Sequence, residues 1–542
     1  MNTYLGGKGY TILKSELSIE QQVKIRNDLM IKPFVIGSPM NDAKTFPVYR
    51  ESAKKMYVPH YYGIKEFGTP KHYKINEGHD INLTFNGQLR DYQAPVVNKF
   101  INHCLDVKYG GGLLELYCAW GKTSASLNII TQLKKKTLVI VHKEFLMNQW
   151  IERINQFLPE ARVGKIQGQV IDIDDKDIVI AMLQSLSMKE YPESVFESFG
   201  FTIIDEVHHI SSEVFSRALF KLVTKYMLGL SATMNRKDGT TPVFKMFLGD
   251  VIFKSKRDND RAVVVRAIDY YADDDEFNEV KLDYRGNTQY STMISKLCEY
   301  SRRSEFILKV LVDLLIENTN QQIMILAHNK NVLKYLHDAI SHRNIASVGY
   351  YVGGMKEAAL KETETKKVVI ATYSMASEAL DIKTLTTLIM ATPKTDIEQS
   401  VGRILREKHS NPIVVDIIDS HDIFKNQWRK RKVFYKKENY KIIYNKNATY
   451  TTDLSKWKVL YEPEQNKPNK IDKTNTEIVK LKKDNKTKKS IGSSSSTNDS
   501  DSEIEHYKEN NMDEDVELID NTINSKKIEN NVCYLKLFDK GK

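Results

Sequence analysis

Residues 112–126 read GLLELYCAWGKTSAS, an apolar run that leads through a glycine-containing turn into a stretch with helical character. A strand, a turn and a helix in this order predict a phosphate-binding loop. The backbone N–H groups and the helix N-terminus would face the phosphates, Lys122 would reach their β and γ oxygens, and Thr123 would bind Mg²⁺. Leu116 stands where the usual pattern has its first glycine, so a Gly-Lys pair in an ordinary turn is the alternative.

A pair of acids follows a second apolar run, FTIIDEVHH at residues 201–209. Open α/β sheets bind ligands at the carboxyl ends of their strands, which is where Asp205 and Glu206 would lie. An acid at this place can hold Mg²⁺, and its neighbour can polarise the attacking water. The alternative is that the two acids only cap a solvated helix.

Short apolar runs and amphipathic stretches alternate outward from these two segments. TLVIVH, DIVIAM and MLGLSAT continue the pattern in the first half, and QQIMILAH, KKVVIATY and NPIVVDIID repeat it in the second. Such alternation indicates parallel sheets covered by helices on both faces, since fully apolar runs suit strands buried on both sides. We therefore predict an α/β protein with two tandem domains, at residues 86–250 and 301–425, joined by a polar connector at 251–300.

The flanks differ in composition from this body. Residues 1–85 mix Pro, Gly and Tyr and predict a small N-terminal module that is irregular or contains β-structure. The range 426–465 begins with a segment, 426–446, that carries eight Lys or Arg against one Glu and interleaved aromatics. It is either a nucleic-acid surface or an amphipathic helix whose aromatic side packs on the second domain. Residues 466–542 are polar runs, first basic and then acidic, that predict a disordered tail.

Whole-chain composition excludes several classes of protein. The 542 residues carry a formal net charge of +10, a weak preference for polyanionic partners. Four scattered cysteines without a CxxC pair argue against a disulfide framework or a zinc knuckle. No apolar run approaches the roughly 18 residues that span a bilayer, and the first residues lack a signal-peptide core. These features predict a soluble, intracellular protein without a membrane partner.

Segments in a fixed order resemble the motifs of superfamily 2 helicases of the DExH type, over roughly Leu89 to Asp419. The segments are LRDYQ (89–93), CAWGKTS (118–124), VHKEFLMNQW (141–150), AMLQS (181–185), DEVH (205–208), SAT (231–233), ILAHNK (325–330), ATYSMASEALD (371–381) and QSVGRILR (399–406). Within that superfamily, LGLSATMNRKDG and QSVGRILR are most similar to the XPB branch and its relatives in large DNA viruses. The two α/β domains would then be RecA-like.

Three positions depart from the family pattern. Ala119 and Ala379 stand where motifs I and V usually have glycine, and alanine is penalised wherever φ must be positive. The Arg-Glu-Asp triplet of XPB-like proteins is Arg236-Lys237-Asp238 here, and the reversed charge at Lys237 puts a strand-opening role of that triplet in doubt.

The resemblance implies that ATP and Mg²⁺ bind in a cleft between the two domains and that nucleic acid lies across both. Catalysis would fall to Lys122, Glu206, His208, Arg403 and Arg406. Nucleotide contacts would come from Gln93, Ala119, Gly121, Lys122, Thr123, Ser124, Asp205 and Asp381, with Thr123 and Asp205 on the metal. Coupling of nucleotide state to motion would involve Ser231, Ala232 and Thr233.

Each of these roles has an ordinary structural alternative. His208 and His209 could be cleft histidines, Ser231 and Thr233 could cap a turn, and Gln93 could be a surface side chain. Arg403 and Arg406 could form a solvated basic face, since they lie three residues apart on a predicted helix. Trp120 could be a packing residue or a stacking platform.

Three functions fit the sequence. The first is an ATP-dependent helicase, on DNA in transcription or repair rather than on RNA, which the sequence does not exclude. The second is a duplex translocase that does not unwind, and the third is a nucleic-acid-binding scaffold whose ATPase is impaired by Ala119 and Ala379. Abundant Lys, Asn and Ile agree with the AT-rich genome of a large DNA virus. The expected compartment is then the nucleus, the cytoplasm, a virus factory or the virion.

Overall fold

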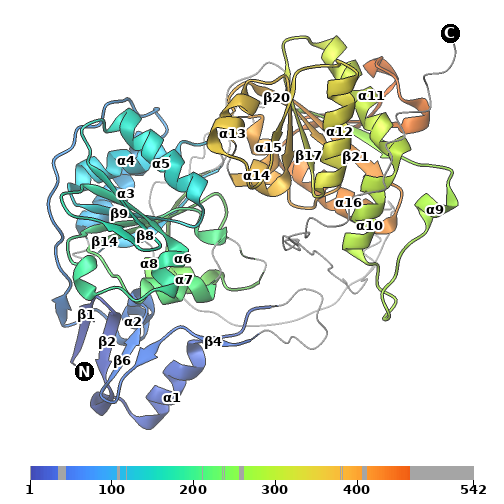
Figure 1. Ribbon diagram of the computed structural model, residues 1–542. Coiled ribbons are helices and arrows are strands. Elements are labelled where there is room, and N and C mark those ends of the chain that lie inside the picture. Colours follow the sequence, from blue (N-terminus) through green and yellow to red (C-terminus); the bar gives the residue numbers. More distant parts are fainter. Residues whose placement is uncertain are drawn as a thin grey trace, which may run out of the picture.

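The computed structural model describes residues 2–34, 44–106, 110–117, 119–209, 212–234, 236, 238–255, 262–378, 380, 382–405 and 412–463 (Figure 1). Two predicted site residues, Asp381 and Arg406, lie outside these ranges. So do Ala379, Lys237 and the predicted tail at 466–542. The described chain forms three units, an N-terminal module followed by two α/β domains.

The N-terminal module is built on a five-stranded sheet with the strand order β5-β6-β2-β1-β7. Its strands are β1 (Thr3–Gly6), β2 (Gly9–Leu13), β5 (Arg50–Glu51), β6 (Lys55–Val58) and β7 (His72–Lys74). Its helices are α1 (Ile19–Asp28) and α2 (His60–Phe67), and β3 (Met30–Ile31) pairs with β4 (Phe46–Pro47). Ser18 and Gln21 form a reciprocal capping box that fixes the start of α1.

The first domain contains an eight-stranded sheet with the order β11-β10-β12-β9-β13-β14-β8-β15. Its strands are β8 (Gly111–Glu115), β9 (Thr137–Val141), β10 (Val163–Gln167), β11 (Val170–Asp172), β12 (Ile178–Met182), β13 (Phe201–Ile204), β14 (Tyr226–Ser231) and β15 (Val251–Lys254). Its helices are α3 (Ala94–Asp106), α4 (Lys122–Leu133), α5 (Glu144–Phe157), α6 (Leu183–Met188), α7 (Ser212–Leu219) and α8 (Thr241–Leu248). All neighbouring strands are parallel except β10 and β11.

Both faces of this sheet are covered, as the continuous apolar runs predicted. All five side chains of β9 are buried. Leu138 and Ile140 belong to the core on one face, and Val139 and Val141 belong to the core on the other. The first of these cores also includes side chains of the N-terminal module such as Tyr10 and Met56. The module and the first domain are therefore packed as one hydrophobic unit.

The second domain has the same design, with the strand order β18-β19-β17-β20-β21-β16-β22-β23. Its strands are β16 (Val264–Tyr270), β17 (Gln322–Ala327), β18 (Val348–Tyr351), β19 (Val368–Thr372), β20 (Leu385–Met390), β21 (Ile413–Asp419), β22 (Lys441–Lys446) and β23 (Lys458–Tyr461). Its helices are α9 (Asp275–Asn278), α10 (Tyr290–Glu299), α11 (Ser301–Glu317), α12 (Lys330–His342), α13 (Glu357–Glu364), α14 (Tyr373–Glu378), α15 (Glu398–Arg403) and α16 (Asp422–Lys437). Two tandem, mostly parallel α/β domains confirm the predicted fold class.

The domain boundaries differ from the predicted ones at both ends of the second domain. Strand β16 comes from the predicted connector, and β22 and β23 come from the predicted extension, yet all three belong to the second sheet. β16 pairs in parallel with both β21 and β22. Polar neighbours obscure these strands in the sequence, and β16 pairs with strands that lie far away along the chain.

Helix α16 shows which side of the basic aromatic segment is buried. Tyr435 and Tyr440 lie in the second-domain core, so for these two rings the packing alternative is correct and the base-stacking alternative is wrong. Arg431 and Asp416 form a fully buried ion pair at 2.8 Å, and the Tyr435 hydroxyl donates to Asp416 at 2.9 Å. Removing one partner of such a pair costs several kcal/mol, so α16 is firmly anchored to the sheet.

The two domains meet through side-chain contacts. The Asn148 amide on α5 donates to Glu357 on α13 at 3.2 Å, and the His208 ring in the first domain lies 3.0 Å from the Gln399 amide on α15. None of the helices in the described ranges has the length and apolar character that crossing a membrane requires.

Candidate functional site

The predicted phosphate-binding loop connects the carboxyl end of β8 to the first residue of α4, which is Lys122. Gly121 has a φ of 93°, and a Cβ atom at this position would lie 2.3 Å from Nε2 of Gln93. Only glycine fits there without displacing a neighbour. The first backbone N–H groups of α4, a helix of 12 residues, are left without intrahelical acceptors, an arrangement that suits a phosphate.

Ala119 adopts a positive φ of 70°, so the departure from glycine carries a conformational penalty. A left-handed backbone costs a residue with a Cβ about 1–2 kcal/mol. The loop therefore holds Ala119 in a conformation that favours glycine, at the expense of stability.

We expect Ala119→Gly to raise the free energy of unfolding by about 1 kcal/mol, because glycine adopts this φ without strain. Thermal unfolding followed by circular dichroism measures the change. Ala125→Gly, inside α4, is the matched control and should lower stability by about 1 kcal/mol. Destabilisation by both changes would contradict strain at Ala119.

The side chain of Gln93 is hydrogen-bonded to the backbone of this loop. The side chain is 2% exposed, and its Nε2 donates to the carbonyls of Trp120 and Gly121 at 3.0 and 3.3 Å. Its Oε1 accepts from the backbone N–H of Arg90 at 2.9 Å. The surface alternative is therefore wrong, and the contacts make Gln93 a positioning residue for the loop. Contact between Gln93 and the nucleotide base stays a prediction.

The acid pair lies directly beside the lysine. Glu206 follows β13, and its Oε1 lies 2.5 Å from Nζ of Lys122 in an ion pair whose side chains are only 18% and 14% exposed. Glu206 has a φ of 50°, a strained backbone of the kind found at functional sites. The strand ends thus bring Lys122 and Glu206 together across 84 residues of sequence.

Asp205 is buried and held by two donors. The indole Nε1 of Trp150 and the backbone N–H of Glu206 both donate to its carboxylate at 2.9 Å. Burial raises the pKa of Asp205 and the charge of Glu206 raises it further, while Lys122 acts in the opposite direction. Thr123 is the second residue of α4, and its hydroxyl and the Asp205 carboxylate are oxygen donors of the type that Mg²⁺ prefers.

Trp150 was missed as a site residue. It belongs to VHKEFLMNQW and lies on α5, and the sequence pattern assigned it no individual role. Its one polar atom turns out to orient the Asp205 carboxylate. The only signal available in the sequence was a tryptophan on a buried helix, since a buried indole N–H usually has an acceptor.

A chain of hydrogen bonds connects the second domain to His208 and Ser231, and His208 lies two residues after Glu206. The Gln399 amide nitrogen lies 3.0 Å from Nε2 of His208, and Nδ1 of His208 lies 2.6 Å from the Ser231 hydroxyl. Because an amide nitrogen only donates, Nε2 accepts and Nδ1 carries the proton. The Ser231 hydroxyl in turn donates to the carbonyl of Thr233, and the Thr233 N–H returns a bond at 3.2 Å. The structure thus brings together His208, Ser231 and Thr233, with Ala232 buried between the last two.

Arg236 is hydrogen-bonded to the backbone of His208 and so positions this hydrogen-bonded chain. Its guanidinium donates to the backbone carbonyl of His208 at 2.5 Å and to both carboxylate oxygens of Asp238, at 3.0 and 2.6 Å. Burial favours a higher pKa for Asp238, but the bonds from Arg236 and Thr240 outweigh it and lower that pKa. Two members of the predicted triplet therefore fix the loop that carries His208.

Arg403 lies at the end of α15, one helical turn after Gln399. It is 7% exposed, and its guanidinium donates to the backbone carbonyl of Leu380 at 2.8 Å. The alternative of a solvated basic face is therefore wrong for Arg403, and its catalytic role stays a prediction. This bond anchors Arg403 within its own domain, at the segment that resembles motif V.

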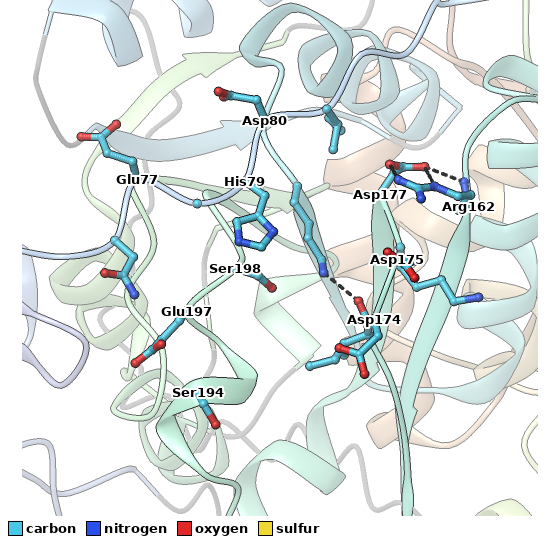
Figure 2. A pocket seen from close by; sticks show the side chains of 16 residues that line it. Glu77, His79, Asp80, Arg162, Asp174, Asp175, Asp177, Ser194, Glu197 and Ser198 are labelled. Atoms are coloured by element: carbon cyan, nitrogen blue, oxygen red, sulfur yellow. Dashed lines mark hydrogen bonds and ion pairs between the residues drawn. The ribbon is translucent and has the colours of Figure 1, made fainter.

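A pocket of about 690 Å³ lies elsewhere, at the amino ends of β9, β12 and β13 (Figure 2). Its lining includes six acidic side chains and three basic ones, and two of these, Asp177 and Arg162, form an ion pair at 2.7 Å. The pocket is at the opposite edge of the sheet from Lys122, which follows the carboxyl end of β8. It is therefore separate from the nucleotide site.

Comparison with known proteins agrees with this geometry. The family model described as "Type III restriction enzyme, res subunit" matches residues 86–236, which include the loop and the acid pair. "Putative ATP-dependent RNA helicase L396" of Acanthamoeba polyphaga mimivirus is 34% identical over 448 residues, covering 80% of this chain and 85% of that protein. "Putative ATP-dependent RNA helicase QP509L" of African swine fever virus is 28% identical over 398 residues, covering 69% and 76%.

A third relative, "Putative helicase 161L" of Invertebrate iridescent virus 6, is 26% identical over 387 residues and covers 67% of this chain and 85% of its own. All three relatives come from large DNA viruses, and the matched regions span most of both chains. The resemblance predicted from the motifs is thereby confirmed. The chain belongs to the superfamily 2 ATP-dependent helicases of large DNA viruses.

Proposed function

We propose that ATP hydrolysis in the cleft between the two domains drives this protein along DNA and separates its strands. The observation that carries the proposal is the hydrogen-bonded chain from Gln399 through His208 to Ser231. It connects the second domain to the segment that bears Glu206. A change at the nucleotide can therefore alter the contact between the domains, which is what a motor needs.

The nucleotide-site residues divide the chemical work. Lys122 and the N-terminus of α4 bind the β and γ phosphates, and Thr123 and Asp205 hold Mg²⁺, which neutralises phosphate charge. Burial raises the pKa of Asp205 because it disfavours the charged carboxylate. A bound cation would favour that charged form. Glu206 orients and polarises the attacking water, and Arg403 stabilises charge that develops on the transferred phosphoryl group.

RNA is the second candidate substrate, because the mimivirus and African swine fever virus relatives carry RNA helicase in their names. The preference for DNA, and for a role with transcription or repair machinery, comes from the XPB-like motifs. A virus factory, nucleus, cytoplasm or virion would each place the protein beside viral DNA.

The deciding experiment compares ATP hydrolysis with single-stranded DNA, duplex DNA and single-stranded RNA, using Lys122→Ala as the blank. DNA should stimulate the wild-type rate more than RNA does. Strand displacement from a partial duplex and displacement of a third strand from a triplex then separate unwinding from translocation on intact duplex. A wild-type rate equal to the Lys122→Ala blank under all conditions would leave only the scaffold alternative.

The exposed side of α16 supports a polyanionic partner. Its aromatic side is buried, while five cations remain at the surface, namely Lys425, Arg429, Lys430, Lys436 and Lys437. Lys425, Arg429 and Lys436 follow one face of the helix at spacings of four and seven residues. These positions suit successive phosphates, whose neutralisation releases counterions.

Reversing three of these charges, in the variant Lys425→Glu, Arg429→Glu and Lys436→Glu, should weaken DNA binding and flatten its salt dependence. Each lost phosphate contact reduces the slope of log K against log salt by about 0.9, so the expected reduction approaches 3. Fluorescence anisotropy with labelled DNA between low and moderate salt measures the slope.

The matched control reverses three exposed lysines on other helices of the same domain, Lys309, Lys334 and Lys361. Its net charge changes similarly, so a specific surface on α16 predicts a much smaller effect in the control. Equal slopes for the two triple variants would contradict the α16 surface.

A further inference from the structure

A tight turn connects α9 to α10 and projects past the end of α10 (Figure 1). Leu282 and Thr288 form an antiparallel bridge at its base. Above the bridge, the N–H of Asp283 donates to the Asn287 carbonyl at 2.8 Å, and the N–H of Gly286 donates to the Asp283 carbonyl at 3.0 Å. The segment is therefore a hairpin-like turn closed by its own backbone.

The Asp283 carboxylate stiffens this turn from inside. It accepts the backbone N–H groups of Arg285 and Asn287 at 2.8 and 2.9 Å, and the Asn287 amide at 3.3 Å. These bonds lower the pKa of Asp283, the one from the Asn287 backbone most of all. Gly286 supplies the positive φ of 80° that the turn needs. A turn held in this way keeps its backbone in one arrangement.

The tip of the turn presents an aromatic ring to solvent. Tyr284 is 87% exposed, and the guanidinium carbon of Arg285 lies 4.9 Å from the centre of its ring. Leu282, next to the tip, is 54% exposed. An exposed aromatic ring with an adjacent cation contributes nothing to the core of the fold. The same pair of groups matches a nucleobase and a phosphate, which stack and pair with them.

The position of the turn also favours a contact with nucleic acid. β16 ends at Tyr270 opposite the end of β21 at Asp419, so the chain leaves β16 at the carboxyl edge of the second sheet. At the base of the turn, the hydroxyl of Tyr290 donates to the carbonyl of Pro393 at 3.2 Å. Pro393 begins the segment that leads to α15, which carries Gln399 and Arg403. The turn thus stands at the edge of the sheet that contributes to the cleft.

We propose that Tyr284 stacks on a nucleobase of the bound DNA and that Arg285 contacts the adjoining phosphate. The ring offers a flat face that every base can use, so the contact is independent of sequence. The inference rests on the proposed function for the presence of DNA at this edge. It assigns a base contact outside the segments that resemble helicase motifs.

The test uses a forked DNA with 2-aminopurine at the junction, whose fluorescence falls when the base stacks on an aromatic ring. Tyr284→Ala should abolish the fall in fluorescence and weaken DNA binding roughly tenfold, since base stacking on an aromatic ring contributes on that order. Tyr284→Phe and Tyr284→Trp should restore both readouts, because they keep the ring.

Tyr271→Ala is the matched control, because Tyr271 is 56% exposed in the same domain and its known hydrogen bonds use backbone atoms only. A Tyr284→Ala protein that folds, binds and quenches like Tyr271→Ala would overturn the inference. A turn that serves a protein partner would give that result. Failure of the proposed function is distinguishable, because it would appear as absent ATP hydrolysis in the wild type, whereas the quenching needs no ATP.

Discussion

Replacing Glu206 with glutamine is expected to slow nucleic-acid-stimulated ATP hydrolysis by about 10²–10⁴-fold, the usual contribution of a general base. Glutamine keeps the shape of the side chain and can still orient a water, but it no longer accepts a proton. The fold should survive, since Glu206 is partly exposed and its backbone contacts are unchanged.

ATP binding should respond in the opposite direction. Glu206 now holds Lys122 at 2.5 Å, and a phosphate has to compete with that carboxylate for the ammonium group. Glu206→Gln removes the competing charge, so ATP should bind at least as tightly as it does to the wild type. Steady-state phosphate release gives the rate, and titration with a fluorescent ATP analogue gives the dissociation constant.

Lys122→Ala is the control that separates the two effects. It removes the phosphate ligand itself and should therefore lose both binding and hydrolysis. Wild-type rates in Glu206→Gln, or a loss of ATP affinity as large as the loss of rate, would be incompatible with the role given to this carboxylate.

Arg403→Ala is the second change with a large expected effect, a fall in the rate of hydrolysis of about 10³-fold or more. The physical reason is that a guanidinium stabilises charge only as it develops in the transition state, so ATP affinity should change little. Gln399, four residues earlier on α15, already reaches His208 in the first domain, and residues four apart share a helix face.

The measurement is the ratio of the effects on rate and on ATP dissociation constant, with Arg403→Lys as the conservative comparison. Lysine restores the charge but not the two-pronged donor geometry, and should recover only part of the rate. Gln399→Ala controls for the shared helix face, since it breaks the link to His208 and should reduce stimulation by DNA more than the basal rate. Parallel losses of rate and affinity in Arg403→Ala would remove Arg403 from the catalytic set.

Much of the architecture was predictable because buried parallel strands are recognisable locally. TLVIV is apolar after its threonine, and all five of its side chains are buried, so this strand can be recognised without knowing its partners. The juxtaposition of Lys122 and Glu206 followed from a general rule, because the carboxyl ends of parallel strands meet at one edge.

What the sequence concealed depends on contacts between distant residues. β16 and β22 join one sheet across some 175 residues, and nothing in their polar neighbourhoods indicates this. The bond from Trp150 to Asp205 spans 55 residues and is a matter of side-chain orientation. Gln93 could be predicted to lie near the nucleotide loop, but whether its amide faces the ligand or the loop is decided by packing.

The hydrophobic core shared by the N-terminal module and the first domain has a practical consequence. The family match begins at residue 86, yet Tyr10 and Met56 lie in the same core as Phe220 and Phe247 of the first domain. The hydroxyl of Tyr61 also donates to the Gly111 carbonyl at the start of β8. A protein that begins at residue 86 would expose the apolar side chains of the first domain that the N-terminal module covers. We expect such a protein to aggregate in solution. The shortest fragment that keeps this core intact therefore starts at the beginning of β1, although the family match starts at residue 86.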